Sequence, residues 1–234
     1  MIDFHSHILP GMDDGSIDEK MSLTMLRESY RQGVNIICAT SHFYADEEDP
    51  ASFLARRSEA YERLRAAMQP EEEYPEILLG AECLYFPGIS GAQEMRQLIL
   101  EKTPFLLVEP PTIPWSDDML DEIEYCGETL HCIPVIAHID RYMRILHDNK
   151  LFDRVEGRRL LIQVNASFFL YRRTEGLALR SLKARRFQFI GSDCHNLDDR
   201  RPNLGQAAEL IYRHGLMPQL EEMNEPFYRL LEKA

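Results

Sequence analysis

The strongest constraint on the fold of this chain is an alternation of short apolar runs with longer amphipathic segments. Seven runs rich in Ile, Val, Leu and Phe are only a few residues long, which is typical of buried strands. They cover residues 2–5, 34–40, 76–83, 105–109, 133–138, 160–165 and 187–192. Strands separated by helices pair in parallel, because each helix carries the chain back across the sheet. The alternation therefore predicts either a parallel α/β barrel or an open α/β sheet.

The segments between these runs carry charged and apolar residues at helical spacing. The first, residues 17–32, opens with Ser16 and Glu19, which have the spacing of a capping box, and closes at Gly33. The remaining helical segments are expected at 51–69, 116–130, 175–186 and 203–214, with one or two short helices in 218–233. No linker, repeat or Pro/Gly/Ser-rich stretch divides the chain, so one domain over residues 1–234 is expected.

Potential metal ligands stand at the carboxyl ends of the expected strands. His5 and His7, in the stretch DFHSHILPGMDDG, lie two residues apart, so both imidazoles can face one ion. An isolated pair of this kind would be read as structural. A parallel barrel, however, gathers the carboxyl ends of all its strands around one site, and structural residues have no reason to be sorted to that end. The candidate ligands are His5, His7, Asp14, His42, Glu82, Glu109, His138, Asp193 and His195.

Composition narrows the class of protein. The formal net charge of −13 argues against a nucleic-acid-binding surface, which needs a basic patch, but metal ions could still attract a phosphate-bearing substrate. No apolar run approaches the roughly 20 residues that span a bilayer, and the acidic start lacks the pattern of a signal peptide. The five cysteines are odd in number and form no CxxC pair. Reduced thiols in a cytoplasmic protein are therefore expected.

The ordered motifs DFHSHILPGMDDG, TSHF, GAE, VEPP, AHIDR and GSDCH resemble those of the polymerase-and-histidinol-phosphatase (PHP) superfamily over nearly the whole chain. The form HILPGMDDG followed by AHIDR is similar, more narrowly, to the bacterial tyrosine phosphatases of capsule and exopolysaccharide gene clusters. This resemblance implies a distorted (β/α)7 barrel and a trinuclear metal site. It also implies hydrolysis of phosphotyrosine on the tyrosine-rich tail of a tyrosine autokinase.

Carried over residue by residue, the resemblance divides the ligands among the metals. It assigns the first metal to His5, His7, Glu82 and Asp193. It assigns the second to Glu82, Glu109 and His138, with Glu82 bridging, and the third to Asp14, His42 and His195. Mixed His and carboxylate ligands favour manganese, iron or zinc over calcium, and manganese is the expected ion. Two or three such ions can supply a hydroxide nucleophile and clamp the phosphoryl oxygens.

Residues beside the ligands have expected roles as well. Arg141 follows His138 by three residues and matches the arginine of the resembled family, so it is expected to bind the phosphoryl group. The alternative is a surface salt bridge with Asp140 or Glu124. Arg201 is a weaker candidate for binding phosphate.

Two further expectations concern the phenyl ring of the substrate and the orientation of a ligand. Phe43, or else Tyr44 or Tyr85, could flank the phenyl ring. Asp3 is expected to orient a ligand imidazole.

Other interpretations use the same residues. Cys194 and Arg200 have the C-x5-R spacing of cysteine-dependent phosphatases, but the loop between them contains two aspartates that would repel phosphate and no glycine. A PHP-type histidinol phosphatase, or another small-molecule or nucleic-acid phosphoesterase, would share the metal site. A non-catalytic metal-binding regulatory module is the remaining alternative.

The sequence also departs from the resembled family at two places. Phe43 stands where the family often has a second histidine. The bulky, basic stretch ASFFLYRR follows Asn165 in place of small, glycine-rich residues. The rim of the pocket is therefore expected to differ.

Overall fold

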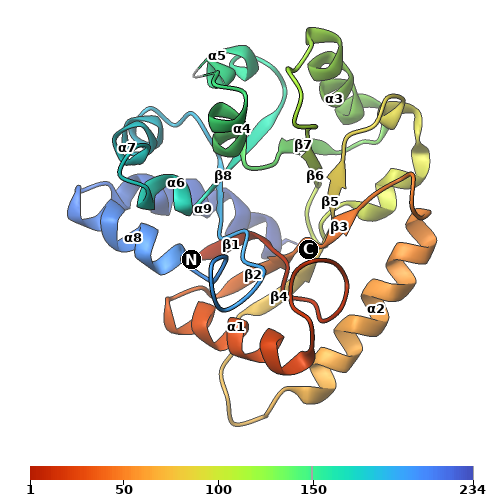
Figure 1. Ribbon diagram of the computed structural model, residues 1–234, viewed down its shortest axis with the longest axis vertical. Coiled ribbons are helices and arrows are strands. Elements are labelled where there is room, and N and C mark those ends of the chain that lie inside the picture. Colours follow the sequence, from red (N-terminus) through yellow and green to blue (C-terminus); the bar gives the residue numbers. More distant parts are fainter. Residues whose placement is uncertain (149, 234) are drawn as a thin grey trace.

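The computed structural model describes residues 1–148 and 150–233, and its strands form a curled parallel sheet at the centre of the molecule (Figure 1). The pairings run in the orders β1-β2-β4 and β3-β5-β6-β7-β8-β9, and every one of them is parallel. The strands are β1 (Ile2–Ser6), β2 (Ile36–Ala39), β3 (His42–Phe43), β4 (Glu76–Leu79), β5 (Glu82–Leu84), β6 (Phe105–Glu109), β7 (Ile133–Ile136), β8 (Leu161–Asn165) and β9 (Phe189–Gly191).

The two sheets are continuous with each other, because β2/β3 and β4/β5 are the halves of two interrupted strands. Ala39 pairs with Leu79 before the interruption and His42 pairs with Glu82 after it, so the register is unchanged. The N–H of Gly80 donates to the carbonyl of Ala39 at 2.9 Å and continues the pairing into the gap. The two interrupted strands correspond to the expected runs 34–40 and 76–83.

The ring closes between β9 and β1. The N–H of Asp193 donates to the carbonyl of His5 at 2.8 Å, and the N–H of His7 donates to the carbonyl of Cys194 at 2.9 Å. Ser6 and Cys194 form a parallel bridge between these bonds. The fold is therefore α/β with a distorted (β/α)7 barrel, which confirms the expected fold class.

Helices surround the ring on its outside (Figure 1). Among the described residues, no helix combines the length and apolar character that a membrane span requires. The α-helices are α1 (Glu19–Arg31), α2 (Pro50–Ala67), α3 (Asp117–Thr129), α4 (Ile139–Ile145), α5 (Leu151–Val155), α6 (Ser167–Leu170), α7 (Glu175–Lys183), α8 (Leu204–Arg213) and α9 (Met217–Leu231). Two 3-10 helices, η1 (Ile89–Gly91) and η2 (Gln93–Leu98), follow β5.

The capping box expected at the start of α1 is wrong. Asp18 caps the helix and accepts a hydrogen bond from the N–H of Met21 at 2.7 Å. Ser16 is held in the preceding loop, because its N–H donates to the carbonyl of His7 and its carbonyl accepts from the N–H of Gly11. Its backbone therefore serves the loop that carries the DDG residues and does not begin the helix.

Aromatic side chains fill the amino end of the barrel. Phe4 stacks on Phe189 with ring centroids 3.8 Å apart, and Phe105 packs edge-on against both rings. Phe227 of α9 lies 5.9 Å from Phe4 and Phe105, so this helix closes the base. All four rings are buried. The amino end is thus a packed apolar plug, and only the carboxyl end has room for polar groups.

Candidate metal centre

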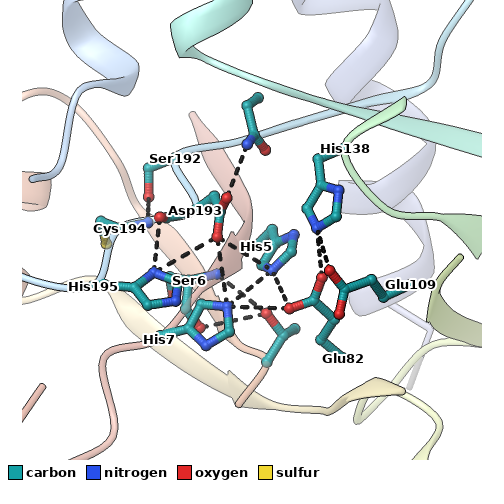
Figure 2. A network of polar contacts seen from close by, with 12 residues as sticks. His5, Ser6, His7, Glu82, Glu109, His138, Ser192, Asp193, Cys194 and His195 are labelled. Carbon is teal, nitrogen blue, oxygen red and sulfur yellow. Dashed lines mark hydrogen bonds and ion pairs between the residues drawn. The ribbon is translucent and has the colours of Figure 1, made fainter. Parts of the chain in front are cut away.

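The nine candidate ligands, with Glu82 among them, come together at the carboxyl end of the barrel. Figure 2 shows the part of this centre formed by His5, His7, Glu82, Glu109, His138, Asp193 and His195. Glu82 is fully buried. Its Oε2 lies 3.1 Å from Nε2 of His5, 3.3 Å from Nε2 of His7 and 3.1 Å from Nδ1 of His42. Its Oε1 lies 2.7 Å from Nε2 of His138. One carboxylate therefore stands among four imidazoles, the position that a bridging ligand would need.

The candidate ligands form four groups in which the potential ligand atoms lie within 4.8 Å of one another. Each of the nine belongs to at least one group, and His5, His7, His42 and Glu82 each belong to two. His7 belongs to one group with Asp14 and to another with Asp193. The resemblance assigns His7 to the first metal only and Asp14 to the third, so the geometry does not reproduce that assignment. The groups are His7-Asp14-His42-His195, His5-Glu82-His138, His5-His7-Asp193 and His42-Glu82-Glu109.

Several buried polar atoms of the centre have no hydrogen-bond partner within the described residues. They include Oε2 of Glu82, Nδ1 of His42 and Nε2 of His195. A buried polar atom without a partner is costly, and a cation between these atoms would satisfy them. The mixture of imidazole nitrogens and carboxylate oxygens suits manganese, iron or zinc. The residues present therefore fit a cluster of divalent transition-metal ions.

Two polar residues that the sequence analysis did not single out orient the imidazoles. Oδ2 of Asp13 lies 2.8 Å from Nδ1 of His7 and accepts from the backbone N–H of His42 at 2.9 Å. Oε1 of Gln163 lies 3.2 Å from Nδ1 of His5 and accepts from the N–H of His138 at 2.7 Å. Both contacts leave the Nε2 atoms of His5 and His7 facing the centre. The available signals were the doubled aspartate of DDG and the polar residue within β8.

Asp3 does not orient an imidazole, so that expectation is wrong. Its Oδ1 accepts from the backbone N–H of Ser192 at 2.7 Å and of His5 at 3.4 Å. Burial raises the pKa of Asp3 to about 6. This side chain lies at the β1–β9 junction, where the register of β1 shifts between Asp3 and Ser6. The shift is a bulge that lets Phe4 and His5 both turn toward the barrel interior.

The backbone is constrained at two of the ligands. His138 and Asp193 each lie two residues after the end of a strand, with φ values of 27° and 53°, in a region that residues other than glycine rarely adopt. Gly191 is needed for close approach, because a Cβ there would lie 2.5 Å from Cβ of His5. Strand ends that hold strained conformations around a tight contact are consistent with a preorganised site.

Ion pairing dominates the electrostatics of the centre. Burial alone would lower the pKa of His7, but its hydrogen bond to Asp13 and the negative charges of Asp13 and Glu82 raise it to about 10. Burial likewise opposes the charged form of His138, yet Glu82 and Glu109 raise its pKa to about 9. Although burial works against ionisation of Glu82, His5 and His138 hold its pKa well below the usual range. The carboxylates thus create a negative potential at these imidazoles, and a negative potential favours a bound cation.

Two arginines lie at the mouth of the centre. Arg141 contacts Oδ2 of Asp193, and its Nη1 lies 3.5 Å from Oε1 of Glu109. Arg200 donates to Oδ1 of Asp193 at 2.8 Å, and its Nη1 lies 3.5 Å from Oδ2 of Asp14. Both line a cavity of about 380 Å³. Each guanidinium therefore contacts candidate ligands and also faces open space.

The alternative of a surface salt bridge for Arg141 is wrong. Asp140 accepts from the backbone N–H of Asn165 at 2.8 Å, and Glu124 pairs with Arg158 and Arg159. Both carboxylates therefore already have other partners.

Two weaker substrate-binding expectations do not match the geometry. Phe43 is fully buried and packs edge-on against Phe53 at 5.5 Å, so it belongs to the core. Tyr44 is the neighbour that reaches the centre, with its ring stacked on His42 at 5.4 Å. Arg201 is exposed and does not line the cavity, whereas Arg200 does. Sequence alone could not distinguish two consecutive arginines.

The position of Cys194 excludes a mechanism in which this cysteine is the nucleophile. Its side chain is fully buried, and burial raises the pKa of the thiol well above its usual value. A reactive cysteine needs an accessible thiolate of lowered pKa. The C-x5-R interpretation therefore fails on geometry as well as on sequence, and Arg200 of that motif instead contacts Asp193.

Comparison with known proteins gives consistent matches over nearly the full length. The family model described as capsular polysaccharide synthesis, CpsB/CapC, matches residues 1–223. The tyrosine-protein phosphatase CpsB of Streptococcus agalactiae is 32% identical over 231 residues, covering 91% of this chain and 90% of the relative. The tyrosine-protein phosphatase YwqE of Bacillus subtilis is 29% identical over 220 residues, covering 90% and 84%.

A solved structure agrees with these relatives. It comes from the set described as YwqE from Bacillus subtilis and CpsB from Streptococcus pneumoniae, unique metal-dependent tyrosine phosphatases. It aligns with a TM-score of 0.83 and 27% sequence identity, covering 99% of this chain and 94% of that one.

Proposed function

This chain belongs to the CpsB/CapC family of capsular polysaccharide synthesis, and from that premise we propose that it hydrolyses phosphotyrosine in a protein substrate as a metal-dependent phosphatase. The observation that carries the proposal is the gathering of nine potential ligands, the buried Glu82 among them, beside two arginines that face a cavity. A phosphate monoester dianion is the substrate class that suits both features.

The nine residues named from the sequence are the proposed ligands of two or three ions, with Glu82 as the bridging ligand. Their unpaired buried atoms support this assignment. When bound, such ions supply a hydroxide nucleophile at neutral pH and neutralise charge on the phosphoryl oxygens. Asp13 and Gln163 keep the imidazoles of His7 and His5 in a single orientation, so that their Nε2 atoms stay directed at the centre. Manganese is the proposed ion, with iron and zinc as alternatives.

Arg141 is the proposed phosphate-binding residue. Arg200 is proposed as a second one, because it lines the same cavity. Charges on Asp193, Glu82 and Glu109 raise the pKa of Arg141 although burial opposes this, so the guanidinium stays cationic. Its side chain is 23% exposed, which lets the N–H fork reach the cavity. A fork of this kind can hold two non-bridging phosphoryl oxygens and keep the phosphorus atom facing the ligand cluster. A tyrosyl leaving group, with a pKa near 10, needs less protonation than an alkyl alcohol does.

The proposed physiological substrate is the phosphotyrosine tail of a tyrosine autokinase that regulates capsule or exopolysaccharide synthesis. The names of the matched relatives and family support a phosphotyrosine protein of capsule synthesis as the substrate, and the autokinase tail is what the family resemblance implies. A cytoplasmic location is proposed with it, because the five cysteines are unpaired, as expected in a reducing compartment.

The test combines metal analysis with a substrate panel. We expect purified protein to carry two or three transition-metal ions, to lose activity in chelator and to regain it with manganese. Metal-loaded protein should hydrolyse a phosphotyrosine peptide faster than histidinol phosphate or a phosphodiester. Full activity in chelator would refute the metal assignment. A preference for histidinol phosphate would instead make the chain a small-molecule phosphatase with the same centre.

A further inference from the structure

A groove leads away from the metal centre along one side of its mouth. The cavity of about 380 Å³ that contains Arg141 and Arg200 adjoins a second cavity of about 320 Å³. Both are lined by Asp140, Arg144, Phe168 and Thr174, so the two cavities adjoin each other along these residues. We call the two cavities together the rim groove. It extends beyond the space that a phosphoryl group would occupy.

The wall of the rim groove is built by the stretch ASFFLYRR, which distinguishes this sequence from the family it resembles. Figure 1 places the short helix α6 of this stretch near the end of β8, with α4 close by. Phe168 and Phe169 are buried and anchor α6 in the core. Tyr171, which is 55% exposed, and Arg173 follow the anchor and line the groove. The bulky residues therefore fix a wall, and the residues after them present an aromatic ring and a cation.

The charge of the rim groove differs from that of the rest of the molecule. The chain has a net charge of −13, and most of its arginines pair with a carboxylate, as Arg154 and Arg158 do with Asp117 and Asp121. Within residues 1–148 and 150–233, Arg144 has no carboxylate within 4.0 Å, and the same holds for Arg173.

The acidic residues of the groove already have partners. Asp193 is engaged by Arg141 and Arg200, Asp140 accepts from a backbone N–H, and Asp199 accepts from Asn196. Arg144 and Arg173 thus remain as cations available to a bound anion.

We propose that the rim groove binds the residues that flank phosphotyrosine in the substrate chain, and that Arg144 and Arg173 bind an acidic side chain among them. The inference rests on the proposed function, because one of the two cavities is lined by Arg141 and Arg200, beside which the phosphoryl group would lie. A polypeptide is the occupant favoured by the apolar residues of the groove, since the exposed ring of Tyr171 and the partly buried Leu177 offer contact area that a small phosphate monoester cannot use. Because Arg144 and Arg173 are two neighbouring cations on an otherwise acidic protein, they favour a carboxylate of the substrate at this position.

The test compares phosphotyrosine peptides that differ only in flanking charge. One series carries glutamate at one of the three positions before or after phosphotyrosine, and the matched series carries glutamine there. At low salt we expect kcat/KM to be about fivefold higher for the best glutamate peptide, mainly through KM, and the preference to shrink as salt is added. In Arg144→Ala/Arg173→Ala the ratio of the two kcat/KM values should fall to about one. Arg144→Glu/Arg173→Glu should instead prefer a lysine peptide.

Arg180→Ala is the matched control, because Arg180 is an exposed arginine of α7 that lines neither cavity. It should keep the wild-type preference. Equal rates on glutamate and glutamine peptides in the wild-type protein, or a preference that survives in the double variant, would overturn this inference and leave the proposed function standing. Hydrolysis of neither peptide by metal-loaded protein would refute the proposed function, and this inference with it.

Discussion

The amino and carboxyl ends of the barrel differ in the side chains that fill them. At the amino end, Phe4, Phe105, Phe189 and Phe227 fill the interior with aromatic carbon, and α9 seals it. At the carboxyl end, the same strands lead into carboxylates and imidazoles, and several of their atoms lack a hydrogen-bond partner among the residues that the structure describes. The first end lowers the free energy of the folded state by burying apolar surface, whereas the second raises it by burying polar atoms. The difference indicates that stability resides at the base and chemistry at the mouth.

Loss of the central carboxylate should produce the largest effect at the mouth. Glu82→Gln keeps the shape of the side chain but removes the charge that four imidazoles share. We expect metal content to fall and turnover of a phosphotyrosine peptide to drop by at least about a thousandfold, because metal ions supply both the nucleophile and charge stabilisation. Elemental analysis and steady-state kinetics measure this, with circular dichroism to verify folding. Unchanged metal stoichiometry would show that Glu82 is not a ligand.

The matching change at the base should affect stability and leave the chemistry intact. Phe227→Ala removes a buried ring that packs against Phe4, Phe105 and Phe189. It should lower the free energy of unfolding by about 3–5 kcal/mol, measured by denaturant titration. Metal content and kcat of the folded fraction should stay at wild-type values. A loss of kcat at full metal occupancy would mean that the two ends are coupled.

Arg141 provides a smaller change, which separates substrate binding from metal binding. Arg141→Ala removes charge-assisted hydrogen bonds worth about 1.5–3 kcal/mol each before solvent compensation, so turnover should fall by roughly ten- to a hundredfold. Metal content should be unchanged. Arg141→Lys should restore little, because an ammonium group cannot form the two-pronged contact. Wild-type kinetics in the alanine variant would exclude Arg141 from phosphate recognition.

Cys194 should give the smallest effect, although it lies between two proposed ligands. Its thiol is buried and its pKa is raised by that burial, so it has no role as a nucleophile. Cys194→Ser should keep most of the activity, and thiol alkylation of the wild-type protein should change the rate little. The measurement is kcat beside metal content for both preparations. A thousandfold loss with metals still bound would revive a cysteine mechanism.

The sequence predicted the parts of this structure that depend on local pattern. Apolar runs marked the strands, and ligand residues at strand ends could be placed on one face because parallel strands share their direction. It did not predict that the second strand resumes as β3, since the polar Thr40 and Ser41 end the apolar run before it. It also did not predict the break at Gly80, which lies within the expected run 76–83. The helices α4, α5 and α6 were missed because seven or fewer residues give no clear helical period.

Residues that act through others were the hardest to predict. Asp13 and Asp14 are neighbours in sequence, yet their roles differ. Asp13 contacts Nδ1 of His7, on the side of the ring away from the centre, whereas Asp14 belongs to a group of potential metal ligands. Gln163 orients His5 across a separation of 158 residues, which no local pattern records. For the same reason, the sequence pointed to Arg201 as a phosphate-binding residue, whereas Arg200 is the one that lines the cavity. These roles depend on which strand lies beside which, and that is decided by the closure of the ring.

The closure of the ring between β9 and β1 has a consequence for how the protein is made. His5 and His7 come from the first strand, whereas Asp193 and His195 follow the last, so contacts of very high sequence separation are needed to assemble the centre. Such contacts form late in folding, because the entropy of closing a long loop must be overcome first. During synthesis the proposed ligands of the first strand could share an ion with their partners only after residue 195 has been added. Metal bound to the finished site would then stabilise only chains whose barrel has closed, and it would act as a thermodynamic check on complete folding.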